Sequence, residues 1–246
     1  MSSRNRFFIP AEAWRGDEGS LSGDEAKHCA RVFRHRVGDE IEVFSGLGEF
    51  SVARIVGIES RSVWIERLSS ERQAACPPIT LAASLLRGKN FETIIQKACE
   101  IGVREIVPLE TDNCVARVDS REVSKKLLKW KRVAIEACKQ SGLTFLPEIR
   151  EPRSLTSFAD GDGADLKLVA ALSDRSRSLR EIIDGENSVS VAIGPEGDFS
   201  PAELEFLRER GYAELDLGAT TLRAETAAIH ALSILVYELA TRTATG

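Results

Sequence analysis

The chain has few of the features on which secreted, zinc-binding or membrane-spanning proteins depend. Its 246 residues include five cysteines, an odd number, and no C-x-x-C pair. This argues against a disulfide framework and against the usual zinc and redox motifs, so we expect reduced thiols. No apolar run approaches the roughly 20 residues of a membrane helix, and the polar start, MSSRNRFFIP, is unlike a signal peptide. We therefore expect a soluble cytoplasmic protein.

Motifs for several common cofactors are missing as well. The sequence contains no G-x-G-x-x-G dinucleotide fingerprint, no P-loop and no cluster of metal ligands. Its net charge of -5 and pI of about 5.5 argue against a nonspecific nucleic-acid binder, so any surface for RNA has to be local. An apolar content of 43% is nevertheless enough for a substantial core in one large domain or two smaller ones.

The stretch 189–240 organises the rest of the chain. Residues 189–193, VSVAI, are apolar and mostly β-branched, which predicts a short interior strand. The next residues, GPEG, predict a tight loop, because glycine permits unusual dihedral angles and proline donates no hydrogen bond. Ser200, followed by proline and by a carboxylate in the first turn, predicts a helix that ends near Gly211.

A second unit of the same kind follows. Residues 212–217 predict a strand, 218–223 a loop, and 225–240 a helix rich in alanine, leucine and isoleucine. We expect the two loops at the carboxyl ends of neighbouring parallel strands, where open α/β sheets bind their ligands. Glycine loops are also common as purely structural turns, and that alternative remains open on the pattern alone.

Two motifs in this stretch resemble the carboxyl-terminal signature of SPOUT-class RNA methyltransferases: IGPEG and LG-x-x-x-LR-x-ETA. Within that class the chain looks most like the RsmE family, which methylates ring nitrogen 3 of a uridine in small-subunit (16S) ribosomal RNA. The resemblance covers nearly the whole chain. It implies a parallel α/β sheet after a small PUA-like β-barrel, with S-adenosylmethionine bound in a deep carboxyl-terminal trefoil knot, a topology that few proteins have.

The resemblance also implies which residues hold the cofactor. Backbone groups in three loops are expected to contact the adenosine and methionine parts of S-adenosylmethionine, and no metal is expected. The expected residues are Leu172, Ile193, Gly194, Pro195, Glu196, Gly197, Leu217, Gly218, Thr221 and Leu222. Glu196 either orients hydroxyl groups of the cofactor or caps its own loop.

Arg223 is the catalytic residue that we predict. Methyl transfer is an in-line displacement, so the protein mainly has to align donor and acceptor and to manage the proton of the acceptor. The imide nitrogen of uridine is a weak acid, and a guanidinium over the base favours its anion. The alternative role of Arg223 is a structural clamp that pairs with Glu225 or another carboxylate. His230, on the apolar last helix, is expected to be packed or at an interface.

Residues 1–72 are expected to form the barrel domain, because short β-like runs are separated by glycines. A helix is predicted over 22–35, with one basic face. The motifs RFF and H-x-x-x-VFR-x-x-x-GDEI resemble the RNA-contacting domain of the family, and Phe33 stands where leucine is commoner. Arg6 and Arg34 are the expected RNA contacts, and exposed aromatic rings could stack on unpaired bases. A solvated helix face would carry similar charges.

Residues 73–78 are expected to link this domain to a methyltransferase domain over 79–246. Strands and helices alternate from residue 79 onward, which predicts a mostly parallel sheet. Asn90 is expected to cap a helix that ends near Gly102, and Lys97 on that helix either reaches the site or pairs with a neighbour. A long basic helix over 120–140 is either a rim for phosphates or a solvated face.

Three residues depart from the family pattern. Asn113 stands where the family usually has arginine, Lys139 replaces a glutamate, and Leu143 replaces an arginine. These departures keep a second hypothesis open, in which the chain is a noncatalytic RNA-binding or ribosome-assembly protein that retains the fold. A third is an α/β enzyme that uses another nucleotide.

The last helix, over 225–239, is apolar on most sides and must therefore be buried. A homodimer interface would bury it, as the resemblance implies, and packing within one chain is the alternative.

Overall fold

The computed structural model describes residues 4–185 and 187–243, which form two compact units. The first unit consists of residues up to 75 together with 138–146, and the second of residues 76–137 and 147 onward. The division at 75/76 lies within the segment where we expect the linker. That residues 138–146 group with the first unit is a feature that the periodicity of the sequence does not predict.

The first unit is built on a six-stranded sheet in the order β1-β4-β5-β6-β3-β2. The β1 and β4 strands pair in parallel, and all the other neighbours are antiparallel. Alternate residues of the strands form one buried apolar core, as the period of two along a strand requires. The strands are β1 (Arg6–Phe8), β2 (Trp14–Arg15), β3 (Glu18–Ser22), β4 (Glu40–Phe44), β5 (Glu49–Ile58) and β6 (Ser62–Arg72), with a single turn η1 (Ala11–Ala13).

The helix predicted over 22–35 begins where expected but is shorter and less regular. Ser22 is the N-cap of α1 (Gly23–Lys27), and the chain then widens into a π-helical turn, η2 (His28–Val32). In that turn the amide of Phe33 donates to the carbonyl five residues earlier, at 2.9 Å. Such turns are rare and are often found at functional sites.

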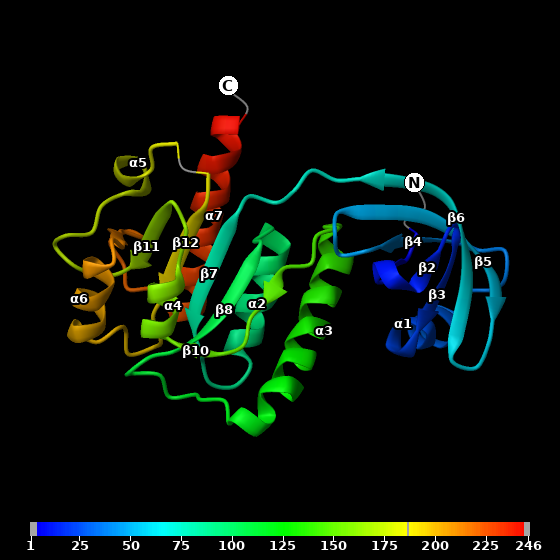
Figure 1. Ribbon diagram of the computed structural model, residues 1–246, viewed down its shortest axis with the longest axis horizontal. Helices are drawn as coiled ribbons and strands as arrows, with labels where there is room; N and C mark the ends of the chain where they lie inside the picture. Colours follow the sequence, from blue (N-terminus) through cyan, green and yellow to red (C-terminus); the bar gives the residue numbers. More distant parts are fainter. Residues whose placement is uncertain (1–3, 186, 244–246) are drawn as a thin grey trace. The chain divides into compact units, whose positions relative to one another are not determined.

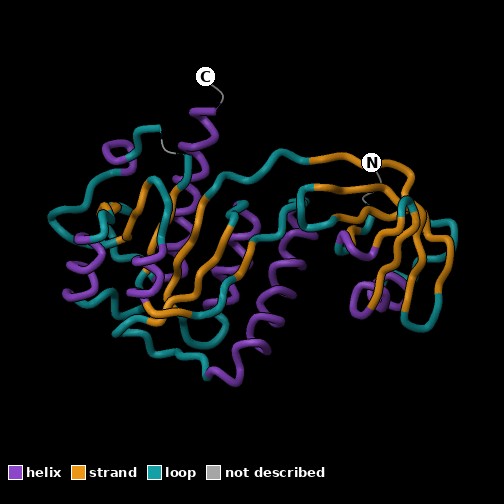
Figure 2. The backbone as a smooth tube through the Cα atoms, in the orientation of Figure 1, coloured by secondary structure: helices purple, strands orange, loops and turns teal. Residues whose placement is uncertain are grey.

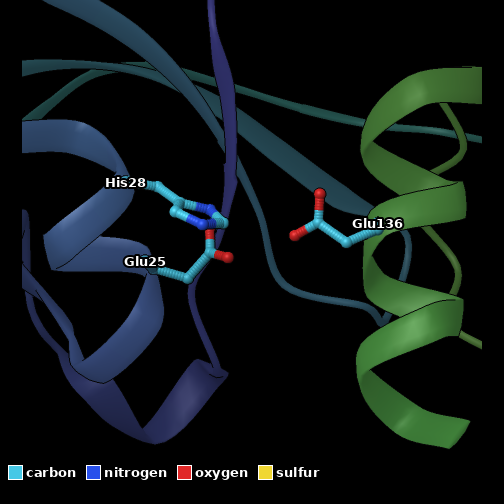
Figure 3. Close-up of side chains that lie close together, drawn as sticks. All are labelled: Glu25, His28 and Glu136. Carbon is cyan, nitrogen blue, oxygen red and sulfur yellow. The ribbon is translucent and has the colours of Figure 1, made fainter. Parts of the chain in front are cut away.

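Lys139, one of the three departures, has a structural partner in the first unit. It lies near the end of α3 (Val123–Ser141), and its ammonium is 3.1 Å from a carboxylate oxygen of Glu25. The Glu25 side chain projects from α1 beside His28 (Figure 3) and also accepts from the amide of Phe8 at 2.9 Å. Both side chains of the pair are at most 14% exposed, so removing either partner would leave a charge largely out of water.

The second unit contains a parallel sheet in the order β10-β8-β7-β12-β11-β13, with β9 beside β8. Every residue of β12 is buried, as expected for an interior strand covered on both faces. The strands are β7 (Ile79–Ser84), β8 (Glu105–Glu110), β9 (Glu148–Ile149), β10 (Arg153–Ser154), β11 (Leu166–Ala170), β12 (Val189–Ile193) and β13 (Ala213–Leu215).

Helices cover this sheet (Figure 1). The last helix, α7, packs against β7, β12 and α2, while α4 packs against β8, β10 and α6. The helices of this unit are α2 (Asn90–Ile101), α4 (Leu155–Gly161), α5 (Leu179–Ile182), α6 (Pro201–Glu209) and α7 (Ala224–Thr243), and the short turn η3 (Ser120–Glu122) leads into α3. Among the described residues, no helix is long and apolar enough to cross a membrane.

Two expectations about this unit are wrong in detail. Asn90 is the first residue of α2 rather than its cap, which is Lys89, although the helix does end at Gly102 with φ +92°. The strands β12 and β13 are not neighbours either, because β11 pairs with both of them. Three strands therefore bring their carboxyl ends to one place, and the loop after β11 is the third of the three loops that the family resemblance implies.

Candidate active site

A cavity of about 490 Å³ lies at the carboxyl ends of β11, β12 and β13. In Figure 2 the segments that leave these three strands are loops rather than helices. The volume is within the usual range for a small-molecule site. The lining residues come from four segments: Asn90 at the start of α2; Ala170, Ala171 and Leu172 at the end of β11 and beyond; Ile193, Gly194, Pro195, Glu196 and Asp198 at the end of β12 and beyond; and Leu215, Leu217, Thr220, Thr221, Leu222, Arg223, Ala224, Glu225 and Ala227 from the end of β13 into α7.

The loop after β12 is a tight turn. The amide of Asp198 donates to the carbonyl of Pro195 at 3.0 Å, and the Asp198 carboxylate accepts from the next amide at 2.7 Å. A side chain at Gly194 would be tightly placed, because an added Cβ would lie 3.0 Å from an Asp198 oxygen and 3.2 Å from the backbone nitrogen of Phe199. The close approach of the backbone therefore favours glycine here.

The segment that follows β8 holds this loop in place through hydrogen bonds from a side chain. The side-chain amide of Asn113 donates to the carbonyls of Gly197, at 3.1 Å, and Asp198, at 3.0 Å. A departure from the family pattern thus holds the predicted cofactor loop in place.

The start of α6 is tied to the same segment. Ser200 caps the helix in a capping box with Glu203, and its hydroxyl also donates to the Asp112 carboxylate at 2.7 Å. The backbone amide of Asp112 donates in turn to Glu203 at 2.9 Å. The loop and the helix start therefore share one network with the residues after β8.

The loop after β13 has much less support of this kind. Gly218 has φ +106°, which an L side chain rarely adopts, and its amide donates to the Asp216 carboxylate at 2.8 Å. At its far end, the Arg223 carbonyl accepts from the amide of Ala227 at 2.8 Å, inside the first turn of α7.

The loop after β11 is anchored through Glu214 of β13. The Ser173 hydroxyl donates to this buried carboxylate, and so does Arg208 of α6 at 2.5 Å. Burial acts to raise the pKa of Glu214, but the hydrogen bonds from Arg208 and Ser173 outweigh it, so the pKa lies below its ordinary value. Ser176 donates to the carbonyl of Ala171 at 2.7 Å, which shapes the edge of the cavity.

The cavity fits a cationic cofactor. Its charged lining residues are three carboxylates, those of Glu196, Asp198 and Glu225, and one cation, Arg223. An acidic lining of this kind suits a sulfonium, since opposite charges attract strongly where water is partly excluded. Among the described residues no carboxylate forms a salt bridge with Arg223, so the clamp on Glu225 is not what the structure contains.

Most of the residues predicted to hold the cofactor lie in this cavity. All of them line it except Gly197 and Gly218, which are in the two loops but not among the lining residues. The other predictions fare less evenly. Lys97 pairs with Glu100 at 2.8 Å, which confirms the structural alternative, and His230 is exposed on α7 rather than packed within the chain.

The two expected RNA contacts differ in exposure. Arg6 has only 15% of its side chain exposed, and its guanidinium lies 3.3 Å from Glu42. Arg34 is exposed and has no salt bridge among the described residues. Arg34 therefore has more surface to offer a ligand.

Three functional contributions were missed by sequence reasoning. Asn90 lines the cavity, Asn113 holds a loop, and Glu214 anchors another. In the sequence Asn113 stands out only as a departure from the family pattern, and its role is not predicted there because its contacts are formed with residues more than 80 positions away.

The chain matches two family models. Residues 73–236 match an RNA methyltransferase domain, which is more than half of the 246 residues. Residues 21–66 match an RNA methyltransferase PUA domain.

Similar proteins cover nearly the full length. The ribosomal RNA small subunit methyltransferase E of Aquifex aeolicus is 32% identical over 92% of this chain and 97% of its own. A methyltransferase from Legionella pneumophila, solved in complex with the cofactor SAM, has a TM-score of 0.90 at 32% identity, covering 96% of this chain and 98% of its own. The ribosomal RNA small subunit methyltransferase E of Neisseria gonorrhoeae, bound to S-adenosyl methionine, has a TM-score of 0.86 at 27% identity, covering 95% and 97%.

Proposed function

The chain belongs to the RsmE family of ribosomal RNA small-subunit methyltransferases, and on that premise we propose that it methylates ring nitrogen 3 of a uridine in 16S ribosomal RNA. The methyl donor is S-adenosylmethionine. The observation that carries the proposal is the cavity at the carboxyl ends of β11, β12 and β13, where residues from both family motifs come together with Arg223. Ligands of open α/β sheets bind at such edges.

The three loops hold the cofactor. Main-chain groups of the residues named above bind its adenosine and methionine parts, and the carboxylates of the lining favour its positive charge. When bound, S-adenosylmethionine supplies an electrophilic methyl group on a sulfonium. The task of the chain is then to bring the uridine ring into line with that methyl group, which lowers the entropic part of the barrier.

Arg223 stabilises the acceptor. Loss of the imide proton leaves negative charge on the nitrogen and on the two flanking carbonyl oxygens of uridine. The exposed guanidinium at the edge of the cavity can pair with that charge as it develops, because no salt bridge to another residue occupies it among the described residues. The target base has to be unpaired or flipped out of its helix to reach this position.

The first unit contacts the RNA, with Arg34 as the main expected contact and Arg6 as a weaker one.

The protein acts in the cytoplasm as a homodimer. The two copies meet through α7, on which Tyr237 is 64% exposed and Ile229, Ile234 and Val236 are only partly buried. Sedimentation of the parent and of Tyr237→Glu tests the dimer. A dimeric parent and a monomeric variant are expected, and a monomeric parent contradicts this part of the proposal.

The segment from β12 to α7 forms the trefoil knot that is typical of the SPOUT class. Its support is the family membership and a strand order in which β12 lies between β7 and β11, so that chain segments distant in sequence surround it. An experimental backbone traced through residues 166–236 tests the knot directly.

Transfer of a tritiated methyl group tests the activity. Labelled S-adenosylmethionine is incubated with the full chain and with small ribosomal subunits from cells that lack this protein, and the RNA is then digested to nucleosides. Label in 3-methyluridine is expected. Cofactor and subunit binding without any label would instead favour a noncatalytic RNA-binding protein, and label in another nucleoside would reassign the acceptor.

A further inference from the structure

We infer that Phe33 is a stacking platform for an unpaired base of the RNA, with Arg31 and Arg34 on either side of it to hold the flanking phosphates. The inference rests on the proposed function and deepens it, because it requires the substrate to present a second unpaired nucleotide to the first unit, away from the base that is methylated.

Phe33 has the geometry of an anchored but open ring. It is 46% exposed. Its ring meets that of the fully buried Phe7 edge to face, with centroids 5.9 Å apart and an interplanar angle of 87°, and lies 6.2 Å from the ring of His35. One side of Phe33 is therefore fixed on the core, while nearly half of its surface remains available. A fixed aromatic side chain loses little entropy when a base stacks on it.

The backbone around Phe33 departs from a regular α-helix in two ways. The preceding residues form the π-helical turn η2, and the next residue, Arg34, has φ +58°. A residue with a side chain is strained in this left-handed conformation, which glycine would adopt without strain. This left-handed residue ends the helical turn, with the amide of His35 donating to the carbonyl of Cys29 at 3.1 Å, and the position directly after the open ring is occupied by an arginine where glycine is usual.

The charges around the ring suit phosphates. Arg31 and Arg34 are both exposed, and neither has a salt bridge among the described residues. The nearby carboxylate of Asp39 is already engaged, since it accepts from the His35 ring at 3.2 Å and from the amide of Arg36 at 2.8 Å. Two arginines without a salt bridge, two residues before and one residue after an exposed ring, match the combination of positive charge and aromatic surface with which proteins bind single-stranded nucleic acid.

Trp64 shows that aromatic exposure alone is not the signal. It is 44% exposed on β6 of the same unit, but two carboxylates on that face of the sheet, those of Glu18 and Glu66, lie directly opposite each other. Arg54 of β5 is also opposite Glu66, and its guanidinium lies 3.8 Å from a third carboxylate, Glu40. Carboxylates there repel a phosphate backbone. The two aromatic residues thus form a matched pair that differs in surrounding charge.

Binding of RNA to the full chain tests the inference. The probe is a fluorescent uridine-rich RNA of about ten nucleotides, either single-stranded or annealed to its complement, at one fixed salt concentration. The variants are Phe33→Leu, which removes the aromatic face but keeps an apolar side chain, Phe33→Tyr, which keeps the ring, and Trp64→Leu as the control. Phe33→Leu should weaken single-strand binding by about 5- to 100-fold, with duplex binding unchanged, while Phe33→Tyr and Trp64→Leu bind like the parent.

Arg34→Gly separates recognition from folding. The glycine relieves the strain at φ +58°, so the melting temperature should stay the same or rise, while affinity for the single strand falls. Parent-like binding by Phe33→Leu, an equal loss with Trp64→Leu, or a parent that does not bind the single strand would overturn the inference. Methyl transfer to small subunits, measured in parallel, distinguishes the stacking role of Phe33 from the proposed activity. If the parent and Phe33→Leu transfer methyl groups equally well, the stacking role is refuted and the activity stands. If RNA binding depends on Phe33 but no methyl group is transferred, only the proposed activity is refuted.

Discussion

Two loops line the same cavity with very different support. The loop after β12 is held by hydrogen bonds from Asn113 and is continuous with the capped start of α6, which is itself bound to Asp112. The loop after β13 has a local bond at Gly218 and joins α7 at Arg223. The difference suggests a division of roles. The loop after β12, the first loop, is a preorganised binding site for the cofactor, and the loop after β13, the second loop, carries Arg223, which acts on the acceptor.

Arg223→Ala should have the largest effect and should separate these roles. Removing the guanidinium takes away the charge that stabilises the uridine anion, so methyl transfer should fall by about 100- to 1000-fold. Cofactor affinity, measured by calorimetry, should change far less, because the remaining lining residues are intact. Arg223→Lys, which keeps the charge but not the planar fork, should retain part of the activity. Equal losses of transfer and cofactor affinity would place Arg223 in cofactor binding or folding.

Asn113→Asp should give the reverse pattern: cofactor affinity should fall, while methyl transfer at saturating cofactor should change little. The carboxylate cannot donate to the carbonyls of Gly197 and Asp198 and would face both of them, so the dissociation constant of the cofactor should rise by about 3- to 30-fold, in line with the cost of unpaired polar groups near a surface. Saturating cofactor should restore most of the transfer rate. Asn187→Asp, at an exposed position beyond this network, is the control, and a cofactor affinity unchanged by Asn113→Asp would contradict the role of the clamp.

Two helix caps give a finer comparison. Ser200 and Ser154 each accept a hydrogen bond from the backbone amide three residues on, at 3.2 Å in both cases. Replacing either with alanine should cost about 1 kcal/mol of stability, seen as a melting temperature lower by about 2–4 °C. Only Ser200→Ala should also weaken cofactor binding, because only that hydroxyl donates to Asp112 beside the cavity. A loss of cofactor affinity in both variants would mean that cofactor binding depends on the general stability of the chain and not on this hydrogen-bond network.

Glu214→Gln should have the smallest effect, a loss of stability at neutral pH that disappears in acid. The pKa of Glu214 is below 4.5, so its charged form stabilises the native state above that pH, and this contribution is lost as pH falls through the lower native pKa. The variant should therefore be less stable than the parent at neutral pH, with the gap closing below about pH 4.5. Unfolding in urea at several pH values measures this, and a gap that does not depend on pH would contradict it.

The sequence predicts well those parts of the molecule that depend on neighbouring residues. The strand over 189–193, the cap at Ser200 and the end of α2 at Gly102 are each determined by local hydrogen bonding and dihedral preference, and the structure confirms all three. Their signals lie within a few residues of the feature itself.

Features that depend on distant segments were wrong or missed. Nothing in the run 212–217 indicates that β11 will lie between it and β12, because strand order is decided by packing across the whole sheet. The clamp of Asn113 joins residues 84 and 85 positions apart. The π-helical turn after α1 was missed for a related reason: its residues have ordinary helix periodicity, and the wider turn arises where the chain must fit against the core of the first unit.

The grouping of residues 138–146 with the first unit has a consequence for biosynthesis. The carbonyl of Thr144 accepts from the amide of Gly48, the amide of Leu146 donates to Gly46, and the hydroxyl of Thr144 donates to Gln73 at 2.7 Å. A nascent chain that has emerged only as far as residue 75 lacks all of these partners. Domains usually fold in order from the amino terminus during translation. The strands and core of the first unit are complete by residue 72, but these contacts at Gly46, Gly48 and Gln73 have to wait for a segment made after much of the second unit has begun to emerge. The two units are thus coupled in time by the ribosome that makes them, and a chaperone would meet the open edge at Gly46 and Gly48 during that delay.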